Sequence, residues 1–197
     1  MKDNYINKGR TNQKIETRGK ILISAQYFLN KGLAFNLEDI AKRTGVSRAT
    51  IYRYFSNVDV LAAEAALDVS TKSPVTIFEN LHGKTIEDKV LEIQDYYNIL
   101  ATNHEKLFRK YLSTVLDSGT STQKRGARRK KTLQLVLENT NYTSKEKRDL
   151  SNLLTILMGI EPLIVTKDVC GLSDDESFEL LKWGMELLLK GFNSSKK

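Results

Sequence analysis

Nine consecutive residues at the end of the first quarter of the chain carry side chains suited to binding another molecule. From Ser47 onward they read Ser-Arg-Ala-Thr-Ile-Tyr-Arg-Tyr-Phe. Guanidinium, hydroxyl and phenol groups donate hydrogen bonds to phosphate oxygens and to the edges of bases. Ile51 and Tyr54 lie one helical turn apart and can pack inward, which leaves the arginines and the other polar groups facing outward or sideways. The spacing therefore predicts a short helix with a polar outer face.

A second short helix precedes this one and could hold it in place. Ile40 and Ala41 are apolar on that helix, and Ala41 is small enough for a close crossing. Gly45 can adopt the left-handed conformation that ends a helix without a steric penalty, and Ser47 can cap the next helix. Residues 36–55 therefore have the spacing of a helix-turn-helix, which places a short helix in the major groove of DNA. An ordinary helical hairpin with the same Gly-Val-Ser turn is the alternative.

The positive charge of the chain is concentrated around this motif. Of the net charge of +7, residues 1–60 supply +6, with eleven Lys and Arg against five Asp and Glu. The remaining residues hold twenty basic and nineteen acidic side chains. Contacts from Lys and Arg to phosphates supply most of the sequence-independent affinity for nucleic acid. This distribution favours a polyanionic partner over a general role in solubility.

Composition restricts the class of protein. The chain has 197 residues, of which 40% are hydrophobic and 28% are charged, values typical of a globular protein of one large or two small domains. The single Cys170 excludes an intrachain disulfide and is typical of a reducing compartment. We find no apolar run of 18 residues and no secretory leader pattern. We therefore expect a cytoplasmic protein with no membrane segment.

No arrangement of residues points to catalysis, a cofactor or a metal. His82 and His104 are isolated and lack the spacing of a helical zinc pair. The chain has no Gly-rich phosphate loop, nucleophile elbow or paired-carboxylate spacing. Glu161 lies beside Pro162 in an apolar stretch, where it could cap carbonyls freed by a kink or contact a cationic effector. We expect a protein that is not an enzyme and needs no cofactor or metal.

Apolar periodicity and cap signals predict an all-α fold. Helices are expected over 14–30, 36–44 and 48–54, from 57 to the Ser73-Pro74 break, from Thr85, from Asn103, over 122–139, from Thr143 and from Ser173. No strand alternation and no Asn-Gly hairpin signal appears. Residues 1–12 are polar and would form either a mobile arm that reaches DNA or a frayed terminus. We place a DNA-binding domain over 1–56 and a second helical domain over 57–197.

The two last predicted helices are apolar over more than one face. On the final helix the apolar residues recur at steps of three and four, which gives a heptad-like stripe. Two helices from each of two chains would bury the excess in a four-helix dimer interface, although an intramolecular core explains any single residue nearly as well. The predicted dimer interface comprises Leu153, Leu157, Ile160 and Ile164, together with Phe178, Leu181, Met185, Leu188 and Phe192.

The segment from Thr17 to Phe55 resembles the N-terminal DNA-binding domain of the TetR/AcrR family of bacterial transcriptional regulators. The resemblance is carried by Arg18, Ile21, Ala25, Phe28, Gly32, Ile40-Ala41, Gly45-Val46-Ser47, Thr50-Ile51-Tyr52, Tyr54-Phe55 and the following Leu61. It implies three helices that end in a recognition helix, followed by a fourth, connecting helix. It also implies a helical C-terminal domain that dimerises and usually holds a small-molecule effector.

Contacts from the predicted recognition helix to bases can be assigned by chemistry. Arg48 is the best candidate for two hydrogen bonds to guanine O6 and N7. Ala49 is small enough to approach a thymine methyl group, and Thr50 could offer its methyl to thymine or its hydroxyl to a phosphate. The resemblance implies that Tyr52 and Tyr54 touch the DNA backbone or a base edge, although Tyr54 also fits a partly buried position.

Other predicted contacts are to phosphates. Asn36 and Ser47 begin the two helices, where backbone N–H groups and the helix dipole favour a phosphate. Arg53 is either a phosphate contact or a solvated charge. Members of the family usually carry Lys near the start of the fourth helix as a backbone clamp, whereas this chain has Val58 there. Asn57 is one group that could replace the missing contact.

Together these features predict a homodimeric transcriptional repressor of the TetR type. It would bind double-stranded operator DNA and be released by an unidentified small-molecule effector. The ligand would move the connecting helix and so change the separation of the two reading heads. The alternative is a TetR-like adaptor that binds proteins and no longer reads DNA, which Val58 and the basic run over 124–131 favour.

Overall fold

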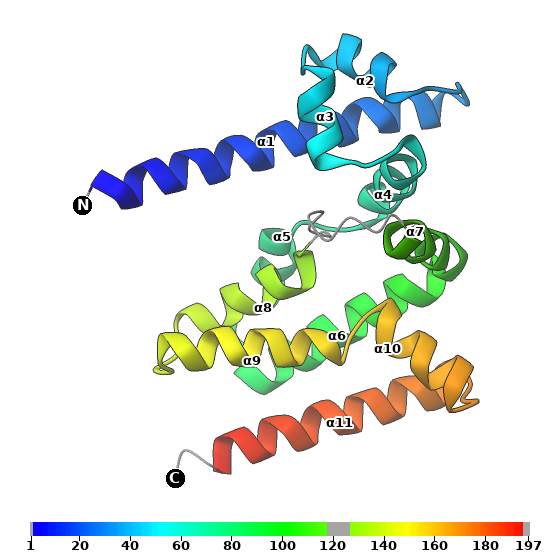
Figure 1. Cartoon of the computed structure of the whole chain (residues 1–197). Helices are drawn as coiled ribbons and strands as arrows, with labels where there is room; N and C mark the ends of the chain where they lie inside the picture. Colours follow the sequence, from blue (N-terminus) through cyan, green and yellow to red (C-terminus); the bar gives the residue numbers. More distant parts are fainter. Residues whose placement is uncertain (1, 118–126, 195–197) are drawn as a thin grey trace. The chain divides into compact units, whose positions relative to one another are not determined.

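The computed structural model describes residues 2–117 and 127–194. Every element within these ranges is a helix (Figure 1), which confirms the all-α fold. The chain divides into two compact units. Unit 1 comprises Met1–Ser70 and Lys106–Arg125, and unit 2 comprises Thr71–Glu105 and Gly126–Lys197. This division differs from the predicted boundary between residues 56 and 57. The helix that follows that boundary, Val58–Ser70, packs against the first helix, Lys2–Asn30, and so belongs to unit 1.

Unit 1 combines the first four helices with one helix from later in the chain. They are α1 (Lys2–Asn30), α2 (Leu37–Thr44), α3 (Arg48–Tyr54), α4 (Val58–Ser70) and α7 (Glu105–Asp117), whose first residue belongs to unit 2. The structure confirms the predicted α2 and α3 to within about one residue at each end. α4 begins one residue after its predicted start but ends at Ser70, before the predicted Ser73-Pro74 break.

The first helix is longer than predicted. It begins at Lys2 instead of residue 14, so the arm predicted over 1–12 is wrong from Lys2 onward. That segment holds one glycine and no proline, so no strong helix breaker stops α1 from extending. α2 lies against the C-terminal half of α1, and the N-terminal half of α1 extends past α2 (Figure 1).

Apolar side chains from all five helices meet in the core of unit 1. Those with no exposed surface are Ile21, Ala25, Ile40, Ile51, Phe55, Leu61 and Ala65. From α7, Tyr111 is buried in the same core, and Leu107, Phe108 and Val115 pack against it. Burying a large apolar side chain stabilises a fold by about 1.5–3 kcal/mol. α7 is therefore a structural part of unit 1.

Unit 2 contains the remaining helices. They are α5 (Pro74–Glu79), α6 (Ile86–Asn103), α8 (Arg128–Glu138), α9 (Ser144–Ile156), α10 (Ile160–Ile164), the π-helix η1 (Val165–Val169) and α11 (Asp174–Ser194). α5 is not among the predicted helices, because the sequence signals assign Ser73-Pro74 only to the end of the preceding helix. The backbone N–H of Thr76 donates to Ser73 Oγ at 3.0 Å. Pro74 occupies the first turn, where its missing N–H leaves no bond unmade.

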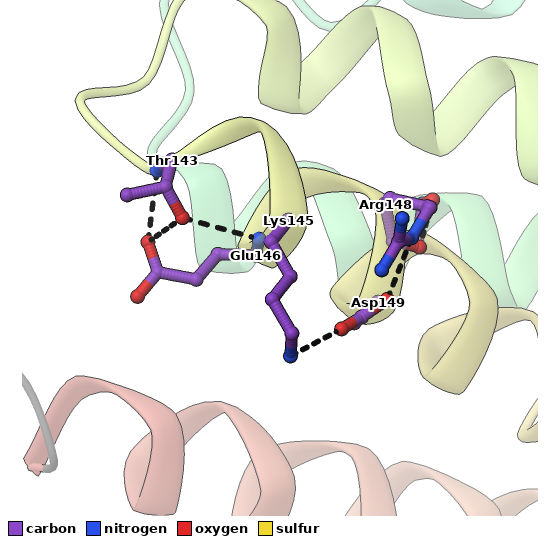
Figure 2. Close-up of polar contacts among 6 residues, drawn as sticks. Thr143, Lys145, Glu146, Arg148 and Asp149 are labelled. Atoms are coloured by element: carbon purple, nitrogen blue, oxygen red, sulfur yellow. Dashed lines mark hydrogen bonds and ion pairs between the residues drawn. The ribbon is translucent and has the colours of Figure 1, made fainter.

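The starts of α9 and α11 confirm the two predicted capping boxes. At α9, Thr143 N donates to Glu146 Oε2 at 2.8 Å, and Glu146 N donates to Thr143 Oγ1 at 3.3 Å (Figure 2). Ser173 and Glu176 exchange the same two bonds at the start of α11. The hydrogen bond from the Ser173 backbone lowers the pKa of Glu176, because it favours the ionised carboxylate.

The stretch from α9 through η1 is long and apolar enough to cross a membrane by length and composition alone, with a mean hydropathy of 1.3. It is not one regular helix, because Gly159 has a φ of 84° and separates α9 from α10. Gly159 N donates to Asn98 Oδ1 at 2.7 Å. Arg129 donates to the Met158 carbonyl and pairs with Glu161 at 2.8 Å. Arg129 therefore caps the Met158 carbonyl at the break between α9 and α10. Glu161 does not contact that carbonyl itself but binds Arg129.

Two helices of unit 2 are joined through α6. Gln94 Nε2 on α6 donates to the carbonyl oxygens of Leu157 and Leu181, both at 2.8 Å. The rings of Tyr142, just before α9, and Phe192, near the end of α11, meet edge to face with centroids 5.0 Å apart. Because the end of α9 lies near the middle of α11 and its start lies near the end of α11, the two helices run antiparallel.

Three residues of the predicted dimer interface are buried within unit 2. Ile160, Leu181 and Met185 are at most 6% exposed there, so they offer almost no surface to a second chain. The heptad-like pattern did not show which apolar face has a partner within the chain. Among the other residues of the prediction, Leu153 is exposed. The half-buried ones are Leu157, Ile164, Phe178, Leu188 and Phe192. Large apolar side chains are exposed on the same two helices at Leu153, Ile156, Leu180, Trp183 and Leu187.

We expect Tyr111→Ala to lower the free energy of unfolding of unit 1 by about 2–4 kcal/mol, because it removes a large side chain from the core. Leu116→Ala on the same helix is the control, since Leu116 is 73% exposed. Urea denaturation, combined with hydrogen exchange of the α1–α4 amides, measures both variants. Equal effects of the two substitutions would show that α7 does not support unit 1.

Candidate nucleic-acid interface

Local hydrogen bonds fix α2, the turn and α3 in a helix-turn-helix geometry. Asn36 Oδ1 accepts from the backbone N–H of Asp39 at 3.0 Å, and the Asp39 side chain accepts from Asn36 N at 3.0 Å. Gly45 ends α2 with a φ of 68°, and its N–H donates to the Ala41 carbonyl. Ser47 Oγ accepts from Thr50 N at 3.2 Å and so begins α3. The predicted breaker and both predicted N-caps are confirmed.

The inner face of this motif is apolar and buried. Ile40 on α2 and Ile51 on α3 have no exposed surface, and Val46 in the turn packs against the same core. Tyr54 also packs against that core and is half-buried. The prediction that Ile51 and Tyr54 face inward is confirmed. Tyr54 is therefore less available to a partner than its neighbour Tyr52, which is 47% exposed.

The outer face of α3 carries the polar groups predicted to read DNA. Arg48, Ala49, Tyr52 and Arg53 are exposed, and Thr50 is half-buried. Thr50 Oγ1 accepts a hydrogen bond from Ser47 Oγ at 2.9 Å. Because the Thr50 oxygen only accepts in this bond, its own O–H can still donate to a phosphate or a base, and the Thr50 methyl is not involved in the bond.

Three of the predicted phosphate-binding residues have structural roles of their own. Asn36 and Ser47 cap α2 and α3, and Asn57 Oδ1 caps α4 by accepting from Val60 N at 2.9 Å. Their acceptor oxygens are already used, and an acceptor oxygen does not bind a phosphate anion. Any phosphate contact from these positions has to come from an N–H or O–H donor. Their contacts to DNA stay predictions.

Arg48 has a partner that the sequence analysis missed. Its guanidinium forms an ion pair with the carboxylate of Glu38, in the first turn of α2. The side chains are 59% and 47% exposed, respectively. Ten residues separate them in the sequence, and only the crossing of α2 and α3 brings them together. No local spacing rule could have found this pair.

A polar network on the core side supports the end of α3. Arg18 on α1 lies over the ring of Phe55, 4.8 Å from its centroid. The same guanidinium pairs with Glu64 on α4 at 2.6 Å, with both side chains largely buried. Tyr111 OH on α7 lies 3.5 Å from Glu64 Oε2. Side chains from α1, α4 and α7 therefore form one network, which reaches the residue after α3 through Arg18.

Comparison with known families agrees with this geometry. A model of the family described as "Bacterial regulatory proteins, tetR family" matches residues 24–65. These residues form a TetR-family DNA-binding domain. The match includes the helix-turn-helix and the first half of α4, and it confirms the resemblance that the sequence indicated. Searches of the curated proteins and of the solved structures found no match.

Val58, the departure from the usual TetR pattern, begins α4 and packs against the core of unit 1. It therefore supports α4 from the inside and offers no charge to a phosphate.

The basic run over 124–131 is only partly described, since residues 124–126 lie outside the described ranges. Within unit 2, Arg128 Nη1 lies 3.5 Å from the Thr71 carbonyl and Arg129 pairs with Glu161. Both arginines therefore contact other groups of unit 2.

Within residues 2–117 and 127–194, no group of three or more His, Cys, Asp and Glu side chains could hold a metal ion. Cys170 is exposed at the end of η1. The helix-turn-helix of α2 and α3, inside the TetR-family match, is the arrangement to which we assign a function.

Two glycine substitutions test the conformation of the turn. Gly45→Ala should destabilise the TetR-type domain by about 1–2 kcal/mol, because an L-residue is strained in the left-handed region. Gly19→Ala, in the middle of α1, should stabilise it by about 0.5–1 kcal/mol. An added Cβ has no neighbour within 4 Å at either position, so backbone conformation alone sets the sign. Thermal or urea unfolding measures both, and a stabilising Gly45→Ala would contradict the left-handed turn.

Proposed function

We propose that this protein is a homodimeric transcriptional repressor that binds operator DNA through α3 and releases it when a small molecule binds unit 2. It acts in the cytoplasm and has no catalytic activity. The observation that carries the proposal is the outer face of α3. Inside the TetR-family match, a helix with a fully buried inner residue presents Arg48, Ala49, Tyr52 and Arg53 to solvent.

The dimensions of α3 support insertion into DNA. Seven residues at about 1.5 Å per residue give a helix of about 10 Å, short enough to lie in the major groove. Arg48 and Ala49 occupy its first turn, and the N-terminal residues of a recognition helix contact base edges. Arg48 is assigned to guanine, Ala49 and Thr50 to thymine, and Tyr52 and Arg53 to the backbone.

Dimerisation follows from the short reading element and from an exposed apolar surface. One short helix contacts few base pairs, whereas a two-fold dimer contacts two half-sites about 34–36 Å apart. α9 and α11 expose Leu153, Ile156, Leu180, Trp183 and Leu187. Exposed apolar side chains of this size on neighbouring helices are typical of interaction sites. We assign these residues to the dimer interface in place of the buried Ile160, Leu181 and Met185.

Support for a small-molecule site comes from polar atoms inside unit 2. Gln94 and Ser177 have no exposed surface, and Gln94 Oε1 and Ser177 Oγ have no hydrogen-bond partner among the described residues. Gln94 donates to the Leu181 carbonyl, one helical turn after Ser177. Buried polar atoms without a partner are costly, and a ligand with a hydrogen-bond donor would satisfy them. Binding there would shift the population of the state that fits DNA.

Arg48→Ala tests the assignment of base contacts. It should weaken binding to the preferred sequence by about 1–3 kcal/mol and relax specificity at one base pair in each half-site. Arg53→Ala, the comparison variant, should weaken binding to all sequences similarly and reduce the salt dependence by about one ion. Fluorescence anisotropy with duplexes selected from a random library, at several salt concentrations, measures both.

Unchanged specificity of the Arg48→Ala protein would remove Arg48 from the base contacts. Absence of duplex binding by the unmodified protein would instead favour the adaptor that binds proteins without reading DNA.

Trp183→Glu tests the dimer surface. A charge at this 58% exposed position should convert the dimer into a monomer, because an unpaired carboxylate in an apolar interface is strongly unfavourable. Ile99→Glu is the matched control, since Ile99 is a 50% exposed apolar residue on α6 of the same unit. Analytical ultracentrifugation measures the molar mass of each variant. A dimer that persists in Trp183→Glu, or dissociates equally in Ile99→Glu, would contradict the assignment.

A further inference from the structure

Glu38 places a carboxylate beside the residue assigned to guanine. It forms its ion pair with Arg48 while both side chains are about half exposed. Within residues 2–117 and 127–194, neither the Glu38 carboxylate nor the Arg48 guanidinium makes another hydrogen bond or ion pair. The pair therefore forms on the surface of the helix-turn-helix without being forced together by burial.

The pair has little value for the stability of the fold. Exposed ion pairs contribute about 0–1 kcal/mol, and α2 already has its N-terminal cap from Asn36 and Asp39. A negative charge on a surface that meets phosphates also opposes DNA binding. Glu38 also interacts favourably with the dipole of α2 from its first turn, but that interaction does not require the pair with Arg48. The pair itself is suited to affect the choice among DNA sequences.

We infer that Glu38 is a specificity-determining residue that acts on Arg48. The guanidinium has five N–H donors, so one edge can stay on Glu38 while another donates to guanine O6 and N7. At a wrong base, Arg48 could gain energy only by moving to a phosphate, which would break the pair and leave Glu38 close to the DNA backbone. Glu38 thus opposes non-specific binding more strongly than specific binding, a form of discrimination by repulsion. This inference rests on the proposed DNA-binding function.

The Glu38→Gln variant tests the inference, since glutamine keeps the size of the side chain and removes its charge. Fluorescence anisotropy would compare a duplex selected from a random library by the unmodified protein with a scrambled duplex of equal length. The variant should bind the scrambled duplex about three- to fivefold more tightly, which corresponds to the range measured for exposed ion pairs. Affinity for the selected duplex should rise by a smaller factor, so the ratio of the two affinities falls.

Two controls separate this role from a change in net charge. Glu16→Gln removes a carboxylate from another exposed ion pair of unit 1, with Lys20 on α1, and should change both affinities by the same factor. In the Arg48→Ala background, Glu38→Gln should also change both affinities equally, because the partner is missing.

The inference is overturned if Glu38→Gln leaves the ratio unchanged, raises it, or lowers it only by weakening binding to the selected duplex. It is also overturned if the ratio falls as much without Arg48 as with it. Failure of the unmodified protein to bind any duplex would overturn the proposed function instead, so the two failures are distinguishable. Circular dichroism of each variant confirms that it is folded before its binding is compared.

Discussion

A helix of seven residues is too short to be stable in water by itself, because so few backbone bonds do not offset the cost of nucleation. Besides its Ser47 cap, α3 therefore depends on tertiary contacts, among them those of Ile51 and Phe55, both without exposed surface. Phe55 in turn lies under Arg18, which is fixed by Glu64. The orientation of the outer face of α3 depends on this chain of contacts. Any change in α1 or α4 that moves Arg18 or Glu64 would therefore turn the face that carries Arg48.

Local signals made α2, α3 and α4 predictable from the sequence. Asn36, Gly45 and Ser47 each act within four residues of their own position, so their types alone indicate where helices begin and end. Contacts that depend on tertiary structure were not predictable. The Glu38 pair requires the crossing of two helices, and the burial of Leu181 depends on which neighbour covers which side of α11. An apolar periodicity identifies a helix with apolar faces, but it does not say whether each face meets its own chain or another one.

Acidic residues in unit 1 show a conflict between helix stability and binding to a polyanion. Asp39 in the first turn of α2 and Asp59 in the first turn of α4 are favourable for the helix dipole. Both carboxylates nevertheless reduce the attraction to phosphates in residues 1–60, which supply +6 of the net charge of +7. Val58 adds no cation at the start of α4. Affinity for DNA should consequently depend strongly on the basic side chains of α1 and α3 and, in the proposed dimer, on the second copy of unit 1.

The participation of α7 in unit 1 makes that unit discontinuous along the chain. Thr71–Glu105, which belong to unit 2, are synthesised before the helix that carries Tyr111. The core of unit 1 therefore stays incomplete until Thr71–Glu105 of unit 2 and then α7 have left the ribosome, so unit 1 cannot finish folding before part of unit 2 has been synthesised. The same topology limits how such regulators can be recombined. A crossover directly after Ser70 would pass on the helix-turn-helix without α7, so an exchange of DNA specificity between chains needs two crossovers or compatible α7 sequences.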